Sequence, residues 1–342
     1  MVLAALDRGR SVVLRAFGPS LRSLLAQRPL RIALLGSLAV LASAATSLWI
    51  PLLMVVLAPI VLGVPHLVSD VRYLIVKPRL HRRPWVLVLV GVPLACTWIR
   101  PNLDTGLLAV LGALLAARGA WSKKLLWASA FGCIYALVLL HPYVAGMLLL
   151  HGHHLVAFAL FLLVFARSVR HAAAPTLVFA AFAGALVLGV FDRIIERPGA
   201  LFTVSSGTGL EQAIAELSPS GSFTMGMRFV ALFVFAQSVH YGLWLRLIPE
   251  EARERPGLRS FTSSFRALRA DVGLPILVLA LGAMVFFGYL ATQSFHHARY
   301  AYLHLAVFHG YLELACLALV LVEGKAALRQ EHPQPSAVAG AS

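Results

Sequence analysis

Apolar stretches of about 20 residues follow one another through most of the chain, with short polar segments between them. A stretch of that length crosses the hydrocarbon core of a bilayer as a helix. The pattern predicts an all-α, polytopic transmembrane helical bundle of about ten spans within residues 31–322. The expected spans are 31–49, 51–72, 84–99, 104–119, 124–141, 143–167, 173–191, 225–247, 272–291 and 298–322.

The segments outside these spans are polar. Residues 1–30 alternate arginine with apolar residues, which is typical of a basic amphipathic helix lying on the membrane surface. The outer loop 192–224 is rich in Gly and Ser, with a short helix expected around Glu216, and the inner loop 249–272 is rich in arginine. The tail 323–342 is expected to be disordered.

Composition and charge agree with a membrane protein. Hydrophobic residues make up 60% of the chain and charged residues only 13%, against about 25% charged in soluble domains. With the N-terminus inside, all but five of the 29 Lys and Arg fall on the inner side, so both termini are predicted to be cytoplasmic. The net charge of +15 then reflects orientation and attraction to the lipid bilayer, not nucleic acid, and we expect a multi-pass protein of a bacterial inner membrane.

Histidine is the chemically informative residue in this chain. Of the 13 histidines, seven fall inside predicted spans: His66, His151, His153, His154, His240, His304 and His309. They occupy the second, sixth, eighth and tenth spans, which all run in the same direction and can surround a common centre. Because ionisable groups in hydrocarbon are costly, such residues mark function by default.

The spacing of these residues indicates which side chains act together. His66 and Asp70 stand four positions apart and share a helix face, and so do His309 and Glu313. A carboxylate at this spacing can join or orient a metal-bound imidazole. Because His304 lies about 140° from His309 around the helix, we expect only one of these two histidines to be a direct ligand.

A second group of histidines lies in the segment His151-Gly-His-His154. Positions 151 and 154 share a helix face, and His153 is expected to point away from it as a lone polar contact. The alternatives for the other candidates are structural. His66 with Asp70 could be a helix-end pair, Gln237 with His240 an interhelical contact, and Tyr241 and Trp244 interface anchors.

The chemistry that this set favours is transition-metal binding. Neutral imidazoles with few carboxylates suit iron or copper, and the three separated cysteines argue against a structural zinc site. A metal within the bilayer implies a lipophilic small-molecule substrate, so we expect an oxygenase that uses Fe(II) and O₂. The expected ligands are His66, His154, His240 and His309, with His151 and His304 in reserve. Asp70, Gln237 and Glu313 are expected to orient the ligands, and Tyr73, Tyr241 and Tyr311 to line the cavity.

Three other functions remain open from these residues. A haem-binding electron carrier also uses two histidines from two helices. A transporter would use His66, Asp70 and Glu313 as a path for protons or metal ions. In a scaffold, the histidines would only join helices. The sequence contains no Walker loop, no G-x-S-x-G and no H-E-x-x-H motif.

The segment Ala58-Pro-Ile-Val-Leu-Gly-Val-Pro-His-Leu-Val-Ser-Asp70 resembles the Gly-x-Pro-His-Gly-Ala-x-Asp signature of the bacterial Brp/Blh family, with Leu67-Val68 in place of Gly-Ala. Members of that family are multi-span membrane proteins that cleave β-carotene to retinal, with iron held by histidines of several helices. The resemblance implies that His66 is a metal ligand and Asp70 its orienting neighbour. It also implies that His154 or His240 matches the family's mid-chain histidine, and His304 with His309 its C-terminal pair.

Overall fold

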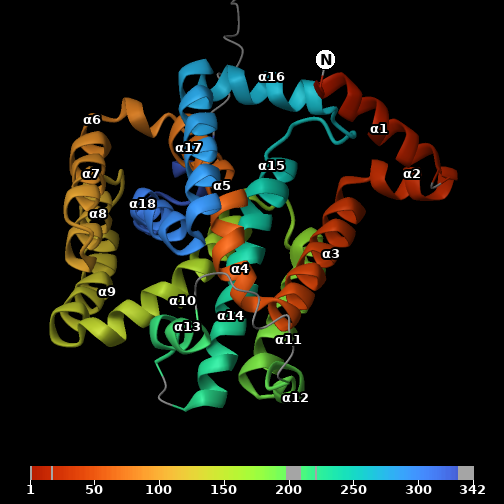
Figure 1. The fold of residues 1–342 in the computed structure, drawn as a ribbon. Coiled ribbons are helices and arrows are strands. Elements are labelled where there is room, and N and C mark those ends of the chain that lie inside the picture. Colours follow the sequence, from red (N-terminus) through yellow and green to blue (C-terminus); the bar gives the residue numbers. More distant parts are fainter. Residues whose placement is uncertain (1, 17, 198–208, 220–221, 330–342) are drawn as a thin grey trace, which may run out of the picture.

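The computed structural model describes residues 2–16, 18–197, 209–219 and 222–329, which form helices joined by short connections (Figure 1). Within this part of the chain, eight helical segments are long and apolar enough to cross a membrane. They are Arg28–Trp49, Pro51–Val76, Trp121–Leu140, Pro142–Phe165, Val169–Val187, Phe223–Glu251, Leu274–Gln293 and Phe295–Glu323. Two shorter apolar segments, Pro84–Ile99 and Leu103–Ala116, stand where the third and fourth spans were predicted. The predicted all-α membrane bundle is confirmed.

Several spans contain more than one type of helical turn. The first half of the chain forms α1 (Val2–Ala16), α2 (Gly18–Ala26), α3 (Arg28–Trp49), α4 (Pro51–Ala58), η1 (Pro59–Gly63), α5 (Val64–Asp70), η2 (Val71–Val76), η3 (Leu80–Arg82), α6 (Pro84–Val86), η4 (Leu87–Gly91), α7 (Val92–Ile99), α8 (Leu103–Ala116) and α9 (Trp121–Leu140). The second half forms α10 (Pro142–Leu160), η5 (Phe161–Phe165), α11 (Val169–Val187), α12 (Asp192–Ile195), α13 (Leu210–Leu217), α14 (Phe223–Gly242), η6 (Leu243–Leu247), α15 (Ile248–Glu251), α16 (Phe261–Val272), α17 (Leu274–Gln293), α18 (Phe295–Glu323) and η7 (Lys325–Ala327). Of the η segments, η3 and η7 are 3₁₀ turns and the others are π-helical.

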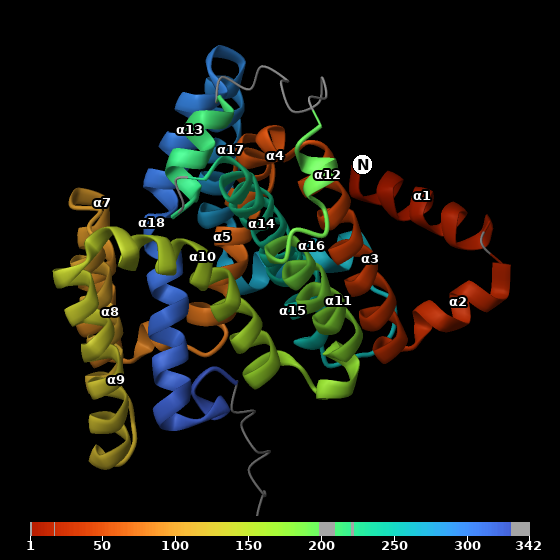
Figure 2. The same cartoon turned by 90° about the horizontal axis from the view of Figure 1, so that it is seen from below.

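Three spans form the centre of the bundle, and the others surround them (Figures 1 and 2). In the most apolar window of Pro51–Val76, Phe223–Glu251 and Phe295–Glu323, 61%, 72% and 61% of the residues are buried, against 6% in α17 and 11% in α9. Helices α7 and α8 pack on α18, whereas α3 and α11 pack on α14. The central spans are the second, eighth and tenth predicted ones, and α10 borders them, as the shared direction of the histidine-bearing spans suggested.

The helix that carries His66 is irregular on both sides of that residue. Pro59 and Pro65 supply no backbone N–H, and the π-helical turns η1 and η2 flank α5. Such turns are frequent at functional sites, because they re-aim the side chains beside them. Gly63 lies against the ring of Tyr302 on α18, and a Cβ at this position would collide with that ring. Glycine therefore allows the helix to approach α18 just before His66.

The predicted surface helix at the N-terminus is tied to the inner loop. The carboxylate of Asp7 in α1 accepts hydrogen bonds from the backbone N–H groups of Phe261 and Thr262, at 2.6 and 3.2 Å. These groups belong to the first turn of α16, where an acidic side chain satisfies free donors and favours the helix dipole. Arg10 donates to the carbonyl of Arg259, so α1 and α16 are held side by side.

The predictions about the outer loop and the tail concern some residues that the structure describes and some that it does not. The short helix expected around Glu216 is present as α13. Residues 198–208 and 220–221 of the outer loop, and residues 330–342 of the tail predicted to be disordered, lie outside the described part of the chain.

Two glycines in spans test the packing of the bundle. Gly112 in α8 lies against the backbone carbonyl of Leu89 in η4, whereas nothing lies within 4 Å of a Cβ added to Gly132 in α9. We expect Gly112→Ala to lower stability by about 1–3 kcal/mol because the two segments must separate. Gly132→Ala should raise it by about 0.5–1 kcal/mol through helix propensity. Thermal unfolding in detergent measures both, and equal effects would contradict this packing.

Candidate metal centre

Three imidazoles from three central helices meet inside the bundle. They belong to His66 of α5, His240 of α14 and His309 of α18. The Nε2 atoms of His66 and His240 are 2.9 Å apart, and the ring centroid of His66 lies 4.8 Å from that of His240 and 4.9 Å from that of His309. One nitrogen of each ring lies within 4.8 Å of a nitrogen of the other two, which is the separation expected of ligands around one ion.

Two buried carboxylates lie beside these rings. Asp70 Oδ2 is 3.2 Å from Nε2 of His66, as the four-residue spacing predicted. Glu313 Oε1 lies 3.4 Å from Nε2 of His240 and accepts a 2.7 Å hydrogen bond from the indole of Trp244. Glu313 was expected to orient His309 on its own helix. It contacts His240 of α14 instead, because Glu313 lies one turn further along α18 than His309. Asp70 and Glu313 are both completely buried.

Several polar atoms of this cluster are buried and have no hydrogen-bond partner among the described residues. They are Nδ1 of His240, Oδ1 of Asp70 and Oε2 of Glu313. Buried polar groups in proteins are nearly always paired, and an unpaired one costs about 1–3 kcal/mol. A cation bound among the histidines and carboxylates would compensate this cost. The donor set therefore fits a metal ion of the kind that nitrogen and oxygen ligands prefer.

The histidines of α10 lie differently from the sequence expectation. The ring of His154 is buried 5.2 Å from that of His240, and neither of its nitrogens has a hydrogen-bond partner. His153 was expected to point away, but its ring lies 3.9 Å from that of His154, tilted by 43°, and 5.6 Å from those of His240 and His309. Instead, His151 points elsewhere and bonds the Leu217 carbonyl at 2.8 Å. His153 and His154 project from α10 about 100° apart, and the side of the helix between them faces the cluster.

Three other residues were expected to act at the site. His304 is exposed and makes no ring contact with the cluster in the described structure, so α18 contributes His309. The Tyr241 ring lies 5.0 Å from that of His66. The side-chain amide nitrogen of Gln237 donates a 3.3 Å hydrogen bond to the Tyr241 hydroxyl. Gln237 therefore holds Tyr241 in position.

The other two predicted cavity tyrosines are remote from the histidines. Tyr73 packs on Phe165 and lines a separate cavity beside α15 and α16, and Tyr311 packs against Gly106 of α8 in the core.

Sequence reasoning missed two contributors besides His153. Trp244, weighed as an interface anchor, is fully buried and holds Glu313 in place. Its position four residues after His240, on the same helix face, was the available signal. Tyr302 is also buried and closes the site beside Gly63. No local pattern distinguishes it from the other aromatic residues of its span.

The short helix α13 packs on α14 and is bonded to the first turns of α18. Its Glu216 accepts hydrogen bonds from Arg299 at 2.8 Å and from Tyr300, both at the start of α18. Partial burial acts to raise the pKa of Glu216, but these donors outweigh it and hold the pKa below its ordinary value. The carboxylate therefore stays ionised at neutral pH and keeps α13 in contact with α18.

No protein-family model matches this chain, and neither the curated proteins nor the solved structures contain a match to it. The assignment of function therefore depends on the geometry of the chain itself.

The partnerless carboxyl oxygens lead to a prediction about stability. We expect the double variant Asp70→Asn/Glu313→Gln, stripped of metal with a chelator, to be about 1–3 kcal/mol more stable than stripped wild type, because each new amide can donate a hydrogen bond to a neighbouring imidazole where a carboxyl oxygen had no partner. If these residues only join helices, the variant should be less stable. Thermal unfolding at neutral pH distinguishes the two. Asp271→Asn, at a partly exposed ion pair with Arg72, is the control and should change stability by less than about 1 kcal/mol.

Proposed function

We propose that the protein is an integral-membrane, histidine-ligated metal oxygenase that acts on a lipophilic substrate. The observation that carries this proposal is the meeting of His66, His240 and His309 at the centre of the bundle, beside two buried carboxylates that each keep an oxygen without a hydrogen-bond partner. Polar groups that are only structural in a membrane protein satisfy one another. These side chains leave hydrogen-bonding capacity unused, which favours a bound cation over a role as interhelical contacts.

Iron is the metal that this donor set supports best. Three neutral imidazoles and two carboxylates of the type found here match the nitrogen and oxygen environment of non-haem Fe(II), and Cys316 is not among the groups at the site. The Nε2 atoms of His66 and His240 are only 2.9 Å apart, and the ring pairs in contact lie 3.9–6.0 Å apart, centroid to centroid. This spacing leaves no room for a porphyrin between them, so a single ion fits better than haem.

Each residue then has a distinct task. His66, His240 and His309 would hold the ion, with His154 as the next nearest imidazole. Asp70 and Glu313 contact the Nε2 atoms of His66 and His240, the same nitrogens that face each other, so these two carboxylates would lie beside the ion and add oxygen ligands to it. Glu313 would be held in place by Trp244.

Iron bound by these residues would supply the chemistry, which is the activation of O₂ for oxidation of an inert C–H or C=C bond. The surrounding chain keeps water out. The Tyr241 ring beside His66 closes the site, and its hydroxyl is held by Gln237.

A substrate that reaches this centre must be soluble in the bilayer, because the ligands lie on spans surrounded by other apolar helices. The resemblance of the Gly63–Asp70 segment to the Brp/Blh signature favours a carotenoid or another isoprenoid among such molecules. The collision that a side chain at Gly63 would make with Tyr302 gives the glycine of that motif a physical reason.

Metal content of the detergent-purified protein tests the centre. We expect close to one iron per chain and no Soret band. His66→Ala, His240→Ala and His309→Ala should each weaken iron binding by about tenfold or more, since even groups that only orient ligands contribute that much. His304→Ala is the matched control, because this histidine shares α18 with His309 but is exposed, and it should retain the iron. A metal-free wild type would overturn the proposal.

Substrate oxidation is tested separately. The iron-loaded protein, supplied with β-carotene in micelles under O₂, should bleach the carotenoid and form a carbonyl product, whereas His66→Ala should be at least about tenfold slower. His304→Ala should match wild type. Stoichiometric iron without oxidation of any carotenoid or isoprenoid would retain the metal centre and refute this substrate class.

A further inference from the structure

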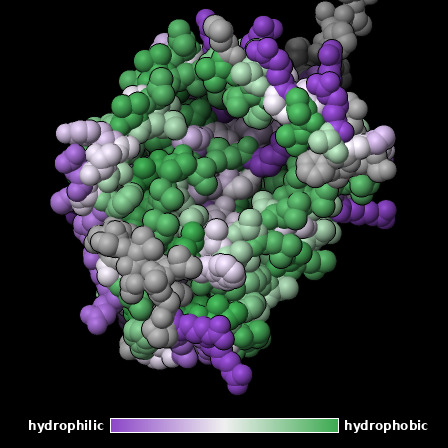
Figure 3. Space-filling model, turned by 45° about the vertical axis from the view of Figure 1, so that its right-hand side comes forward, coloured by the Kyte–Doolittle hydropathy of each residue, from purple (hydrophilic) through white to green (hydrophobic). Residues whose placement is uncertain are grey.

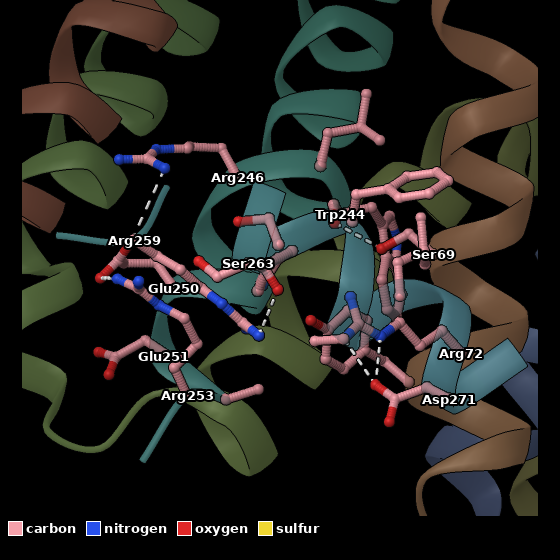
Figure 4. A pocket seen from close by; sticks show the side chains of 18 of the residues that line it. Ser69, Arg72, Trp244, Arg246, Glu250, Glu251, Arg253, Arg259, Ser263 and Asp271 are labelled. Atoms are coloured by element: carbon pink, nitrogen blue, oxygen red, sulfur yellow. Dashed lines mark hydrogen bonds and ion pairs between the residues drawn. The ribbon is translucent and has the colours of Figure 1, made fainter. Parts of the chain in front are cut away.

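A cavity of about 2080 Å³ opens on the inner side of the bundle, away from the histidines. Its wall is formed by η6, α15, α16 and α17 with parts of α1, α3, α5 and η2. Figure 3 shows a hollow in the surface that is bordered by hydrophobic groups and contains hydrophilic ones. Figure 4 shows polar side chains on both sides of the cavity, with Arg72 and Asp271 on one side and Arg246 and Glu250 on the other.

The cavity has a large excess of positive charge. Four carboxylates face ten Lys and Arg side chains: Arg10, Arg31, Arg72, Lys77, Arg167, Arg246, Arg253, Arg255, Arg259 and Arg329. The excess of six positive charges lines one open cavity, in which the low-dielectric walls strengthen the attraction for an anion.

Two of the carboxylates are already shared between cations. Glu250 accepts hydrogen bonds from both Arg31 and Arg253, and Asp271 lies within 2.6 Å of Arg72 and 3.7 Å of Lys77. They cannot neutralise the rest of the wall.

Other arginines of the wall are poorly compensated. Arg246 is about half exposed and lies 3.7 Å from Glu250. The Arg259 guanidinium donates to the Ser263 carbonyl at 2.7 Å. Both guanidinium groups therefore retain donors for an anionic ligand.

The other wall of the cavity is apolar and belongs to a helix that faces lipid. Helix α17 contributes Leu277, Leu281 and Met284 to the lining, yet only 6% of its apolar window is buried inside the protein. The cavity thus joins a row of cations at the end of the spans to an apolar helix surface. A soluble anion would use only the first of these features, whereas a phospholipid would use both.

We propose that this cavity binds an anionic phospholipid of the inner leaflet, with its phosphate between Arg246 and Arg259 and its acyl chains along α17. Guanidinium groups bind phosphate through charge-assisted hydrogen bonds. The site does not depend on the proposed oxygenase function, since its lining contains none of the candidate metal ligands. It adjoins the metal centre only through α5 and Trp244, which form its floor.

Lipid retention measures this binding. The protein is reconstituted in phosphatidylcholine nanodiscs with a minor fraction of phosphatidylglycerol. The protein is then released from the nanodiscs in the mass spectrometer, and the lipid molecules that stay bound to it are counted by native mass spectrometry. Wild type should retain phosphatidylglycerol in preference to phosphatidylcholine. Arg246→Gln/Arg259→Gln should lower this preference by about tenfold, because charge-assisted hydrogen bonds are lost.

The controls separate this site from general surface charge. Arg82→Gln/Lys123→Gln removes two exposed cations from the predicted inner side outside the cavity, and it should leave the preference unchanged. Arg246→Lys/Arg259→Lys keeps both positive charges and should preserve most of the preference for phosphatidylglycerol. Equal loss in the control pair, or no preference in wild type, would overturn the proposal. So would displacement of the lipid by inorganic phosphate alone, which would identify a soluble anion as the ligand.

Discussion

The cost of placing polar groups in an apolar interior governs this structure. Asp70, Glu313 and His66 are completely buried in spans whose other residues are mostly apolar, and water cannot compensate them there. The local irregularities of the fold serve to bring these groups together. The π-helical turns around α5, the close approach at Gly63 and the hydrogen bond from Trp244 all act on the same cluster.

The polar chemistry of the molecule is divided by depth. Neutral imidazoles and two carboxylates occupy the middle of the bundle, and the arginines gather around the inner cavity. Neutral imidazoles suit the middle because they carry no charge into hydrocarbon, whereas guanidinium groups suit the level of the headgroups. Helix α5 connects the two regions: His66 and Asp70 point to the centre, and Ser69 lines the cavity and donates to the Trp244 carbonyl at 2.6 Å.

Periodicity alone was sufficient for contacts within one helix. The contact of His66 with Asp70 follows from the four-residue spacing, and it is present. The same rule failed for Glu313, because the nearest imidazole belongs to another helix. It failed again for His153, since the side of α10 that faces the centre depends on how that helix is rotated against its neighbours.

The sequence by itself determined the membrane class of this protein, the positions of eight of the ten predicted spans and the helices that carry histidine, because each depends on local hydropathy. The tertiary structure alone decided that Trp244 holds Glu313, that His304 is exposed, and that arginines distant in sequence surround one cavity. Rotation and tilt of one helix against another determine these contacts. They arise from the packing of many side chains at once, which no short pattern in the sequence encodes.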